Sequence, residues 1–281
     1  MKNKAEISII IRTFNEEKKI EECLNKILNQ KIKNCFEIII IDSGSTDKTI
    51  KIAEKYPLKI YKIKKSDFTF GKSLNLGCEK AEGSIVVSLS AHAIPLNNYW
   101  LKNLISPFKN KKIGAVYGKE IPNSNTNPME ARRIIGTFKN IEKIRNKDIF
   151  FTNSNSAFKK ILWKQNKFDE KITSSEDHLW ASKITKKGYF IYYQPNAPIY
   201  HSHNYSFFEN YKRTRRQIYN KYILIGKKNH FYIFKKGLLN FFYSVISDIY
   251  FIFKNKYNLI WILLVIPYEI IILLAFLTKK S

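Results

Sequence analysis

The chain has 281 residues, of which 44% are hydrophobic, which is enough for one large α/β domain and a smaller second part. Its formal net charge is +26, with lysine and arginine spread almost evenly, which favours attraction to bilayers or phosphorylated ligands and disfavours a compact nucleic-acid patch. Three cysteines, Cys23, Cys35 and Cys78, have no metal-site spacing and predict unpaired thiols in a reducing compartment.

The chain begins with a strand and an amphipathic helix. A short apolar strand is predicted over Ile7 to Ile11, and it is too short for the core of a signal peptide. The helix that follows carries its apolar residues on one face: Ile20, Cys23, Leu24, Ile27 and Leu28. Thr13 or Asn15 can cap this helix.

The second strand has the strongest local pattern. The run Ile38 to Ile41 is β-branched without polar alternation, which is typical of a strand buried on both faces of a parallel sheet. It stops at Asp42, and a cluster of turn formers leads into a helix predicted over Lys48 to Tyr56. Because ligands of open α/β sheets bind at the carboxyl edge of the strands, Asp42 is expected at a binding site.

A third strand, Leu58 to Ile63, completes a βαβαβ opening typical of nucleotide-binding modules. A dinucleotide fingerprint is excluded because Arg12 to Asn15 contains no glycine where G-x-G-x-x-G is required. The segment Ser66 to Ser73, SDFTFGKS, matches only the end of a P-loop, and no strand runs directly into it. The remaining interpretation is a nucleotide-sugar site, in which polar groups at strand ends hold the base and ribose.

Four motifs together resemble those of family 2 glycosyltransferases, over roughly Ile7 to Tyr211. They are T-F-N-E at Thr13 to Glu16, D-S-G-S-T-D at Asp42 to Asp47, F-G-K-S-L-N at Phe70 to Asn75 and S-E-D at Ser175 to Asp177. The resemblance implies an α/β, A-type glycosyltransferase fold: a Rossmann-like, mostly parallel sheet flanked by helices. Within the family the chain is most similar to bacterial enzymes of surface-polysaccharide assembly, including rhamnosyltransferase-like members.

The resemblance also implies which residues bind the donor. Thr13 and Glu16 would line the base and ribose pocket, and Asp42 would accept a hydrogen bond from a ring N–H of uracil or thymine. Gly71 would permit close backbone approach, and Lys72 would place a cation near the diphosphate. The remaining donor-binding candidates are Asn15, Ser45, Asp47, Asn75 and Ser90. Alternatively, Asp42 caps the following helix and Lys72 is an ordinary solvated lysine.

A metal site is expected where the family has an Asp-x-Asp. After a helix predicted over Ser73 to Ala81, the strand Ser84 to Leu89 ends instead in Ser90-x-His92. His201 and His203 follow a predicted strand at Tyr189 to Tyr193 and two proline turns, where the family often supplies a further histidine ligand. Three histidines favour Mn²⁺ over Mg²⁺. Alternatively, the histidines and Lys72 neutralise the leaving diphosphate without a metal.

The second half of the predicted domain holds the acceptor. A strand is expected at Gly114 to Gly118, a polar flap at Asn123 to Pro128 and a strand under the donor sugar at Phe150 to Phe158, where Asn153 and Asn155 can contact hydroxyls or turn the chain.

A pair of acids precedes a helix predicted over Leu179 to Lys187. The resemblance makes Asp177 the general base that removes the acceptor proton in a single displacement with inversion, and Glu176 a residue that positions acceptor or base. Capping of the helix by Ser175 and these acids is the alternative explanation.

The composition changes after Tyr205. Lys212 to Arg216 is a basic run among aromatic residues, which suits anionic headgroups or a polyprenyl-diphosphate acceptor, although it also fits a solvated helix face and a general bias of the chain toward lysine. Leu259 to Leu277 is barely long enough to span a bilayer, and Pro267 and Glu269 near its centre count against a simple span. A hairpin or an in-plane anchor fits as well as a true crossing, with flanking lysines at the interface: Lys254, Lys256, Lys279 and Lys280.

The sequence therefore predicts a catalytic domain over residues 1–211, with a nucleotide-sugar half at 1–95 and an acceptor half at 96–211, and a helical membrane-attachment region at 212–281. The predicted activity is inverting transfer from a UDP- or dTDP-sugar to a glycan or lipid-linked acceptor, at the cytoplasmic face of the cell membrane and without a nucleic-acid partner. The competing hypothesis is a membrane-attached nucleotide-sugar or glycan-binding protein that has lost activity, because Ser90-x-His92 replaces the two acids.

Overall fold

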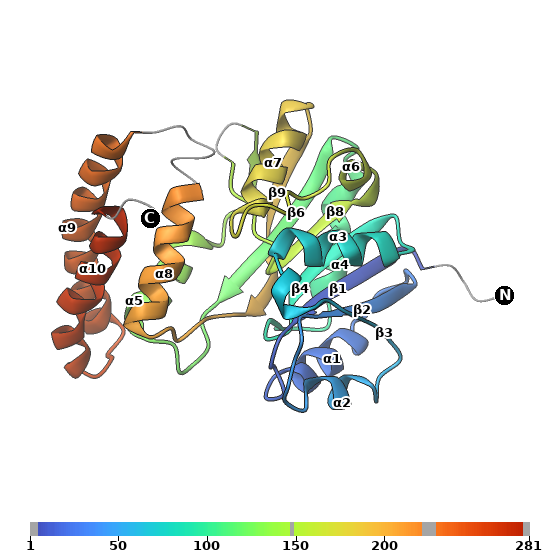
Figure 1. Ribbon diagram of the computed structural model, residues 1–281, viewed down its shortest axis with the longest axis horizontal. Helices are drawn as coiled ribbons and strands as arrows, with labels where there is room; N and C mark the ends of the chain where they lie inside the picture. Colours follow the sequence, from blue (N-terminus) through green and yellow to red (C-terminus); the bar gives the residue numbers. More distant parts are fainter. Residues whose placement is uncertain (1–4, 147–148, 221–228, 278–281) are drawn as a thin grey trace. The chain divides into compact units, whose positions relative to one another are not determined.

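The computed structural model describes residues 5–146, 149–220 and 229–277 (Figure 1). Contacts divide the chain into two units: the first comprises Met1–Ile121 and Phe138–His201, and the second Pro122–Thr137 and Ser202–Ser281. The catalytic boundary predicted at residue 211 thus lies further along the chain than this structural boundary. Residues 122–137, which the sequence assigned to the acceptor half, group with the C-terminal helices.

The first unit is built on one mixed sheet. Among the described residues its strands are β1 (Ile7–Thr13), β2 (Phe36–Asp42), β3 (Lys59–Lys62), β4 (Ile85–Ser90), β5 (Ile94–Pro95), β6 (Ile113–Ile121), β7 (Lys143–Arg145), β8 (Asn155–Lys159) and β9 (Phe190–Tyr200). The order is β3-β2-β1-β4-β8-β6-β9-β5, and β7 pairs with β9. The first four strands are parallel, but β8 is antiparallel to both β4 and β6. Because β6 therefore runs in the direction of β4 and is parallel to β9, six of the nine strands share one direction, and β5, β7 and β8 oppose it. The sheet is mixed but mostly parallel, and the sequence did not predict the opposed strands because an apolar strand pattern carries no orientation.

The helices of this unit cover both faces of the sheet. They are α1 (Ile20–Leu28), α2 (Thr49–Ala53), α3 (Phe70–Lys80), α4 (Trp100–Ile105), α6 (Lys160–Gln165) and α7 (Glu176–Lys186), with 3₁₀ turns at Lys65–Asp67 and Ser106–Lys109. Ile9 of β1 packs in the core beneath α1 and α4, whereas Ile10 points to the opposite face and contacts Gly77 of α3. Alternation along β1 therefore buries both faces, as the isoleucine runs predicted.

Several predicted element bounds and caps need correction. The N-cap of α1 is Lys19, without a side-chain cap, because the Asn15 side chain bonds a neighbouring loop instead; Leu28, expected on the buried face, is exposed. The helix predicted from Ser73 begins at Phe70, where the Thr69 hydroxyl accepts a hydrogen bond from the Lys72 N–H at 3.0 Å.

Two predicted strands in the acceptor half also differ. The strand predicted to end at Tyr193 continues through both prolines to Tyr200 as β9, alongside β6 with a register shift between Gly118 and Glu120. This irregularity accommodates Pro195 and Pro198, which lack the backbone N–H that a regular strand would donate. In contrast, the strand predicted from Phe150 begins only at Asn155.

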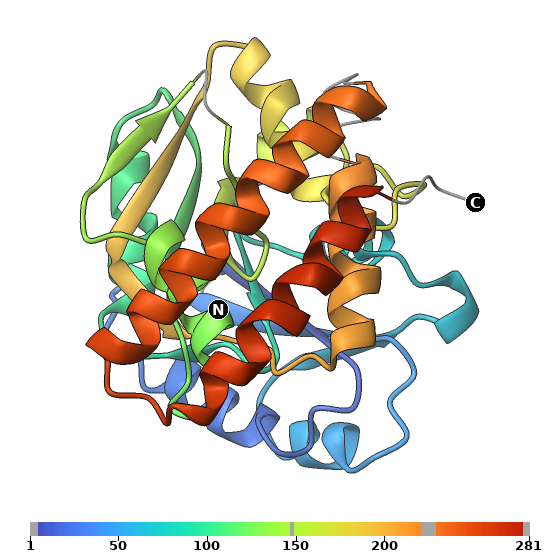
Figure 2. The ribbon, with the colours of Figure 1, turned by 90° about the vertical axis from the view of Figure 1, so that its left-hand side faces the viewer.

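The second unit is helical. It contains α5 (Pro128–Thr137), α8 (Phe207–Ile218), α9 (His230–Lys254) and α10 (Ile260–Leu277). The segment predicted as a flap leads directly into α5, whose first turn is capped by the Asn127 side chain, which accepts a hydrogen bond from the Glu130 N–H. Figure 2 shows α9 and α10 side by side, joined by a turn. Among the described helices α10 is long and apolar enough to cross a membrane, a property that core helices of soluble proteins share.

Candidate active site

The carboxyl ends of β1, β2 and β4 bring the predicted donor residues to one edge of the sheet. Thr13 is paired in register with Asp42, and Arg12 with Ser90. The Ala91 N–H continues this pattern by bonding the Arg12 carbonyl oxygen at 3.3 Å. Parallel strands place their ends together, so residues far apart in the sequence line one edge.

Asp42 is buried and organises its own loop. Its Oδ2 accepts hydrogen bonds from the N–H groups of Gly44 and Ser45, both at 3.1 Å, and its Oδ1 accepts one from the Ser45 hydroxyl at 2.6 Å. Gly44 has a φ of +91°, a conformation that disfavours side chains. Asp42 therefore holds the loop and does not cap α2, which begins at Thr49. Its contact with a base stays a prediction.

The loop after β1 is joined to the loop after β2 by side-chain hydrogen bonds. The Asn15 Oδ1 accepts from the Thr46 N–H at 2.8 Å, and the Asn15 N–H donates to the Ser45 hydroxyl at 2.9 Å. Asp47 accepts hydrogen bonds from the N–H groups of Glu17 and Thr49 at 3.1 and 2.9 Å. Asn15 is held at a φ of +54°. These predicted donor residues thus fix the shape of the edge, at some cost in backbone strain.

The start of α3 lies close to the segment that precedes α7. A Cβ on Gly71 would lie 2.3 Å from the Asp169 carbonyl oxygen, so the close approach that this glycine permits is to the protein's own backbone. All four hydrogen-bonding positions of the buried Asn75 amide are used by Trp163, Phe168 and Glu170, which argues against its predicted donor contact. The Lys72 ammonium lies at the surface, 3.7 Å from an Asp67 carboxylate oxygen.

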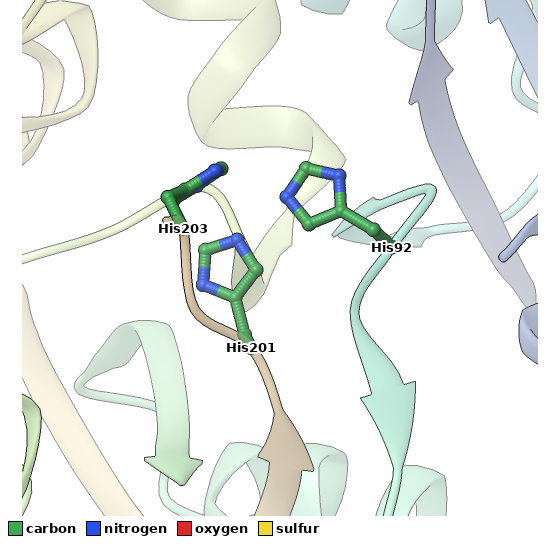
Figure 3. A group of neighbouring side chains, drawn as sticks. All are labelled: His92, His201 and His203. Atoms are coloured by element: carbon green, nitrogen blue, oxygen red, sulfur yellow. The ribbon is translucent and has the colours of Figure 1, made fainter. Parts of the chain in front are cut away.

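Three predicted metal ligands lie together (Figure 3). His92 follows β4, His201 follows β9, and His203 lies two residues further along the chain, just past the boundary of the first unit. The His92 and His201 rings stack with centroids 5.0 Å apart, and one ligand nitrogen from each of the three histidines lies within 4.8 Å of the others. The prediction that these side chains converge is confirmed geometrically, although their metal binding is not.

Two carboxylates orient two of these rings. Glu16 Oε1 lies 2.6 Å from His92 Nδ1, and Glu120 Oε2 lies 2.8 Å from His201 Nδ1. A carboxylate at Nδ1 favours the tautomer that carries its proton there, which turns the Nε2 lone pair outward as metal-binding histidines require. Glu16, which the sequence predicted in the base and ribose pocket, thus contacts the Nδ1 atom of His92. Glu120 was missed, because no sequence pattern on β6 marks it.

The donor set fits a divalent transition metal. Nitrogens bonded to one ion at about 2.1 Å lie about 3.0–3.4 Å apart at tetrahedral or octahedral angles, so the 4.8 Å span would have to contract by about an ångström or more on binding. Three imidazoles with carboxylates behind two of them suit Mn²⁺ or Zn²⁺ better than Mg²⁺, which prefers oxygen ligands.

The predicted catalytic acids begin α7. The N-cap Ser175 has a φ of +66° and makes no side-chain cap, so capping does not account for this serine. Glu176 is buried, and its Oε1 accepts a hydrogen bond from the Asn153 amide at 3.2 Å. Asp177 Oδ1 accepts one from the His178 N–H at 2.8 Å. A strained, left-handed serine directly before two acids is typical of a functional site.

Burial gives both acids raised pKa values. The pKa of Glu176 is raised to about 7, first by desolvation and then by the charge of Asp177. Desolvation raises the pKa of Asp177 to about 6, against hydrogen bonds from the His178 and Asn153 backbone and the positive charge of Arg12. Burial and mutual repulsion therefore disfavour the state in which both acids are ionised, and the pair is more readily protonated than free carboxylates.

Arg12 is the main site residue that the sequence analysis missed. Its Nη2 donates to the Asn153 carbonyl oxygen at 3.3 Å, and its guanidinium lies 5.3 Å from the Phe70 ring centre. Glu176 and Asp177 favour its charged form, although burial lowers its pKa. The available signal was position: Arg12 immediately precedes T-F-N-E and, by strand alternation, points to the face opposite Thr13.

Several buried polar atoms at this edge have no protein partner. Within the described ranges these are Arg12 Nε and Nη1, Thr13 Oγ1 and Asn153 Oδ1. Buried polar atoms normally form hydrogen bonds, so the unmatched atoms of Arg12 and Asn153 beside the acid pair, and that of Thr13 on the opposite face of β1, mark places for a polar ligand. The edge can thus bind a ligand rich in hydroxyl and phosphate oxygens beside a partly ionised acid pair.

The fold is that of the A-type glycosyltransferases. The S. aureus TarS 1–349 structure in complex with UDP matches with a TM-score of 0.58 at 24% identity, covering 76% of this chain and 66% of that one. The mannosyltransferase PcManGT from Pyrobaculum calidifontis, solved with GDP-Man and Mn²⁺, matches with a TM-score of 0.61 at 22% identity, covering 100% of this chain and 77% of that one.

The chain belongs to glycosyl transferase family 2, whose model matches residues 8–165, and it is a glycosyltransferase. It is 30% identical over 219 residues to the O-antigen chain rhamnosyltransferase RfbN of Salmonella typhimurium, covering 74% of this chain and 69% of that protein. It is 33% identical over 201 residues to WbaN of Salmonella anatum, covering 68% of this chain and 61% of that protein. The resemblance inferred from the four motifs is confirmed.

Proposed function

We propose that this glycosyltransferase moves a sugar from a UDP- or dTDP-sugar to a glycan or lipid-linked acceptor, with inversion, in the assembly of a cell-surface polysaccharide. The observation that carries the proposal is the acid pair Glu176–Asp177, desolvated at the start of α7 beside Arg12 of β1. The similarity of the chain to two O-antigen chain rhamnosyltransferases supports a role in polysaccharide assembly and favours a deoxyhexose as the donor sugar.

Asp177 acts as the general base. With a pKa of about 6 it is ionised near neutral pH and basic enough to take the acceptor hydroxyl proton as that oxygen attacks the anomeric carbon. Glu176, held by the Asn153 amide, positions the acceptor. One displacement suffices, so the sugar leaves with inverted configuration and no covalent sugar–enzyme intermediate forms.

The donor lies along the edge formed by β1, β2 and β4. Thr13 Oγ1, buried without a protein partner in the described part of the chain, is available to the nucleoside, and Asp42 faces the base. A divalent cation on His92, His201 and His203 would stabilise the charge of the departing diphosphate. Lys72, exposed at the start of α3, would add a second positive charge near the diphosphate.

The acceptor and location follow from the C-terminal composition. The basic α8 suits a polyprenyl-diphosphate acceptor or anionic headgroups, and we place the protein at the cytoplasmic face of the cell membrane. No nucleic-acid partner is proposed.

The first test is a thermal-shift screen of UDP, dTDP, GDP and CDP, each with and without Mn²⁺ or Mg²⁺. Binding to the folded state must raise the apparent stability. We expect a shift with UDP or dTDP that Mn²⁺ enlarges in the wild type but not in His92→Ala. A nucleotide shift indifferent to metal in both proteins would refute the metal site while leaving the donor site in place.

The second test measures nucleoside diphosphate release with a lipid-linked acceptor pool, using Asp177→Asn as the inactive control. Nucleotide binding without release from any common donor sugar would favour the competing function, a nucleotide-sugar or glycan-binding protein without catalysis. The three converging histidines, two of them backed by carboxylates, argue for a built site against that alternative.

A further inference from the structure

The paired helices α9 and α10 expose two apolar stripes. In α9 the exposed apolar residues include Phe231, Phe234, Leu238, Phe242, Ile246, Tyr250 and Phe253, and in α10 they include Ile260, Leu263, Ile266, Ile270, Leu274 and Leu277. A spacing of three or four residues keeps each set on one face of its helix. Figure 2 shows the two helices side by side, so the stripes belong to one two-helix surface.

The only charges within these stretches are buried and paired. Between Gly237 and Phe253 the sequence has Asp248 alone, and between Leu259 and Leu277 it has Glu269 alone. Arg132 and Arg133 of α5 form salt bridges with these two acids, each of which is at most 2% exposed. The surface between the helix ends therefore presents no charge to its surroundings.

The opposite side of this helix pair is covered by polar helices. Phe207 and Ile218 of α8 pack against α10 and α9, at Tyr268 and in a cluster with Ile233 and Ala275. Between those two contacts α8 carries four cations, Lys212, Arg213, Arg215 and Arg216. A crossing α10 would draw this helix into hydrocarbon, where each charge near the centre costs about 2.5–3.5 kcal/mol.

We propose that α9 and α10 lie in the plane of one leaflet, with their exposed stripes immersed, and do not cross the bilayer. The occupant of the apolar surface is an anionic lipid monolayer, because exposed Lys235, Lys254 and Lys256 lie at the helix ends and the chain carries a net charge of +26. Lys279 and Lys280, predicted to lie at the interface, are outside the described residues. The inference rests on the membrane attachment in the proposed function, but its tests require no sugar transfer.

The first experiment measures cosedimentation with vesicles of phosphatidylcholine alone or mixed with phosphatidylglycerol. Leu263→Gln and Ile246→Gln, at residues 71% and 70% exposed, should each weaken binding to the mixed vesicles about tenfold. The matched control Ile161→Gln, at a residue 57% exposed on α6, should leave binding unchanged. Lys254→Gln combined with Lys256→Gln should cost about thirtyfold on mixed vesicles and little on phosphatidylcholine.

The second experiment distinguishes lying in the plane from crossing. In a Cys35→Ser background, whose remaining cysteines are buried, Asn258→Cys in the turn between the helices and Lys235→Cys near the start of α9 are bound to preformed vesicles. A membrane-impermeant maleimide should label both variants at similar rates. Protection of Asn258→Cys until detergent is added would overturn the proposal in favour of a crossing hairpin.

A second copy of the chain is the other possible cover for this surface. A dimer in solution that binds neither vesicle type, and that Leu263→Gln dissociates, would overturn the lipid assignment. UDP- or dTDP-induced thermal shifts measured in the same preparations report on the donor site. Failed vesicle binding with intact nucleotide shifts therefore rejects this inference alone, and the reverse pattern rejects the proposed donor site alone.

Discussion

Replacing Glu176 by glutamine should stabilise the protein while disabling it. Glutamine keeps an oxygen for the hydrogen bond from the Asn153 amide but removes the charge that burial penalises. The charged groups that influence Glu176 are Asp177 on its own helix and Arg12 on β1. We therefore expect a gain in stability that depends on pH.

The sign follows from the direction of the pKa shift. Above about pH 4.5 the unfolded chain ionises Glu176, whereas the folded protein resists ionisation until about pH 7, so the free energy of unfolding falls across this window and stays low above it. A pKa of about 7 in place of 4.5 corresponds to roughly 3 kcal/mol as an upper bound. Glu176→Gln avoids this loss, so its advantage over wild type should grow from nearly zero at pH 4.5 to that bound at pH 8.

Thermal unfolding of the full chain, followed at pH 4.5, 6 and 8, checks this expectation. For a unit of this size, 3 kcal/mol corresponds to about 6–12 °C in Tm. Asn153→Ala serves as a control that loses the hydrogen bond while keeping the acid. If Glu176→Gln gains the same Tm at pH 4.5 and pH 8, or none at pH 8, Glu176 does not carry a raised pKa and the acid-pair argument fails.

Three further substitutions test other parts of the site. Asp177→Asn should lower kcat about 10²- to 10⁴-fold while leaving nucleotide affinity within twofold by calorimetry, and retained turnover would exclude Asp177 as the base. Glu16→Gln should weaken Mn²⁺ binding about 10- to 100-fold by calorimetric titration, and Glu17→Gln, which faces no histidine, should not; equal effects would remove the orienting role of Glu16. Gly71→Ala should cost about 1–3 kcal/mol in urea unfolding because its Cβ meets the Asp169 backbone, and an unchanged midpoint would contradict that packing.

Local patterns predicted the donor half of the fold well. The isoleucine runs of β1 and β2 are buried on both faces, so their composition alone identified them as central strands. The orientation of β8 and the length of β9 were not predictable in this way. Orientation depends on where the chain returns to the sheet, and Pro195 and Pro198 mark a turn in most contexts although here they lie within an irregular strand.

Long-range contacts explain what the sequence missed in the site. His92 and His201 were identified from positions at which the family supplies metal ligands, but their partners Glu16 and Glu120 are 76 and 81 residues away from them. Arg12 was overlooked for a similar reason, since its neighbours are distant in the sequence: Asn153 lies just before β8, and Glu176 begins α7. An ordinary charged residue becomes informative only when the fold shows which charge it faces.

The replacement of Asp-x-Asp by Ser90-x-His92 changes the candidate ligand atoms after β4, but carboxylates still lie nearby. Glu16 contacts Nδ1 of His92, and Glu120 contacts Nδ1 of His201. Each carboxylate therefore lies on the opposite side of its imidazole ring from the Nε2 atom that could bind a metal. Imidazoles backed in this way bind transition metals more strongly, whereas Mg²⁺ loses the oxygen ligands that it prefers. Inactivity therefore does not follow from the missing acids, because three imidazoles would suit Mn²⁺ or a softer ion where the two acids would suit a hard cation.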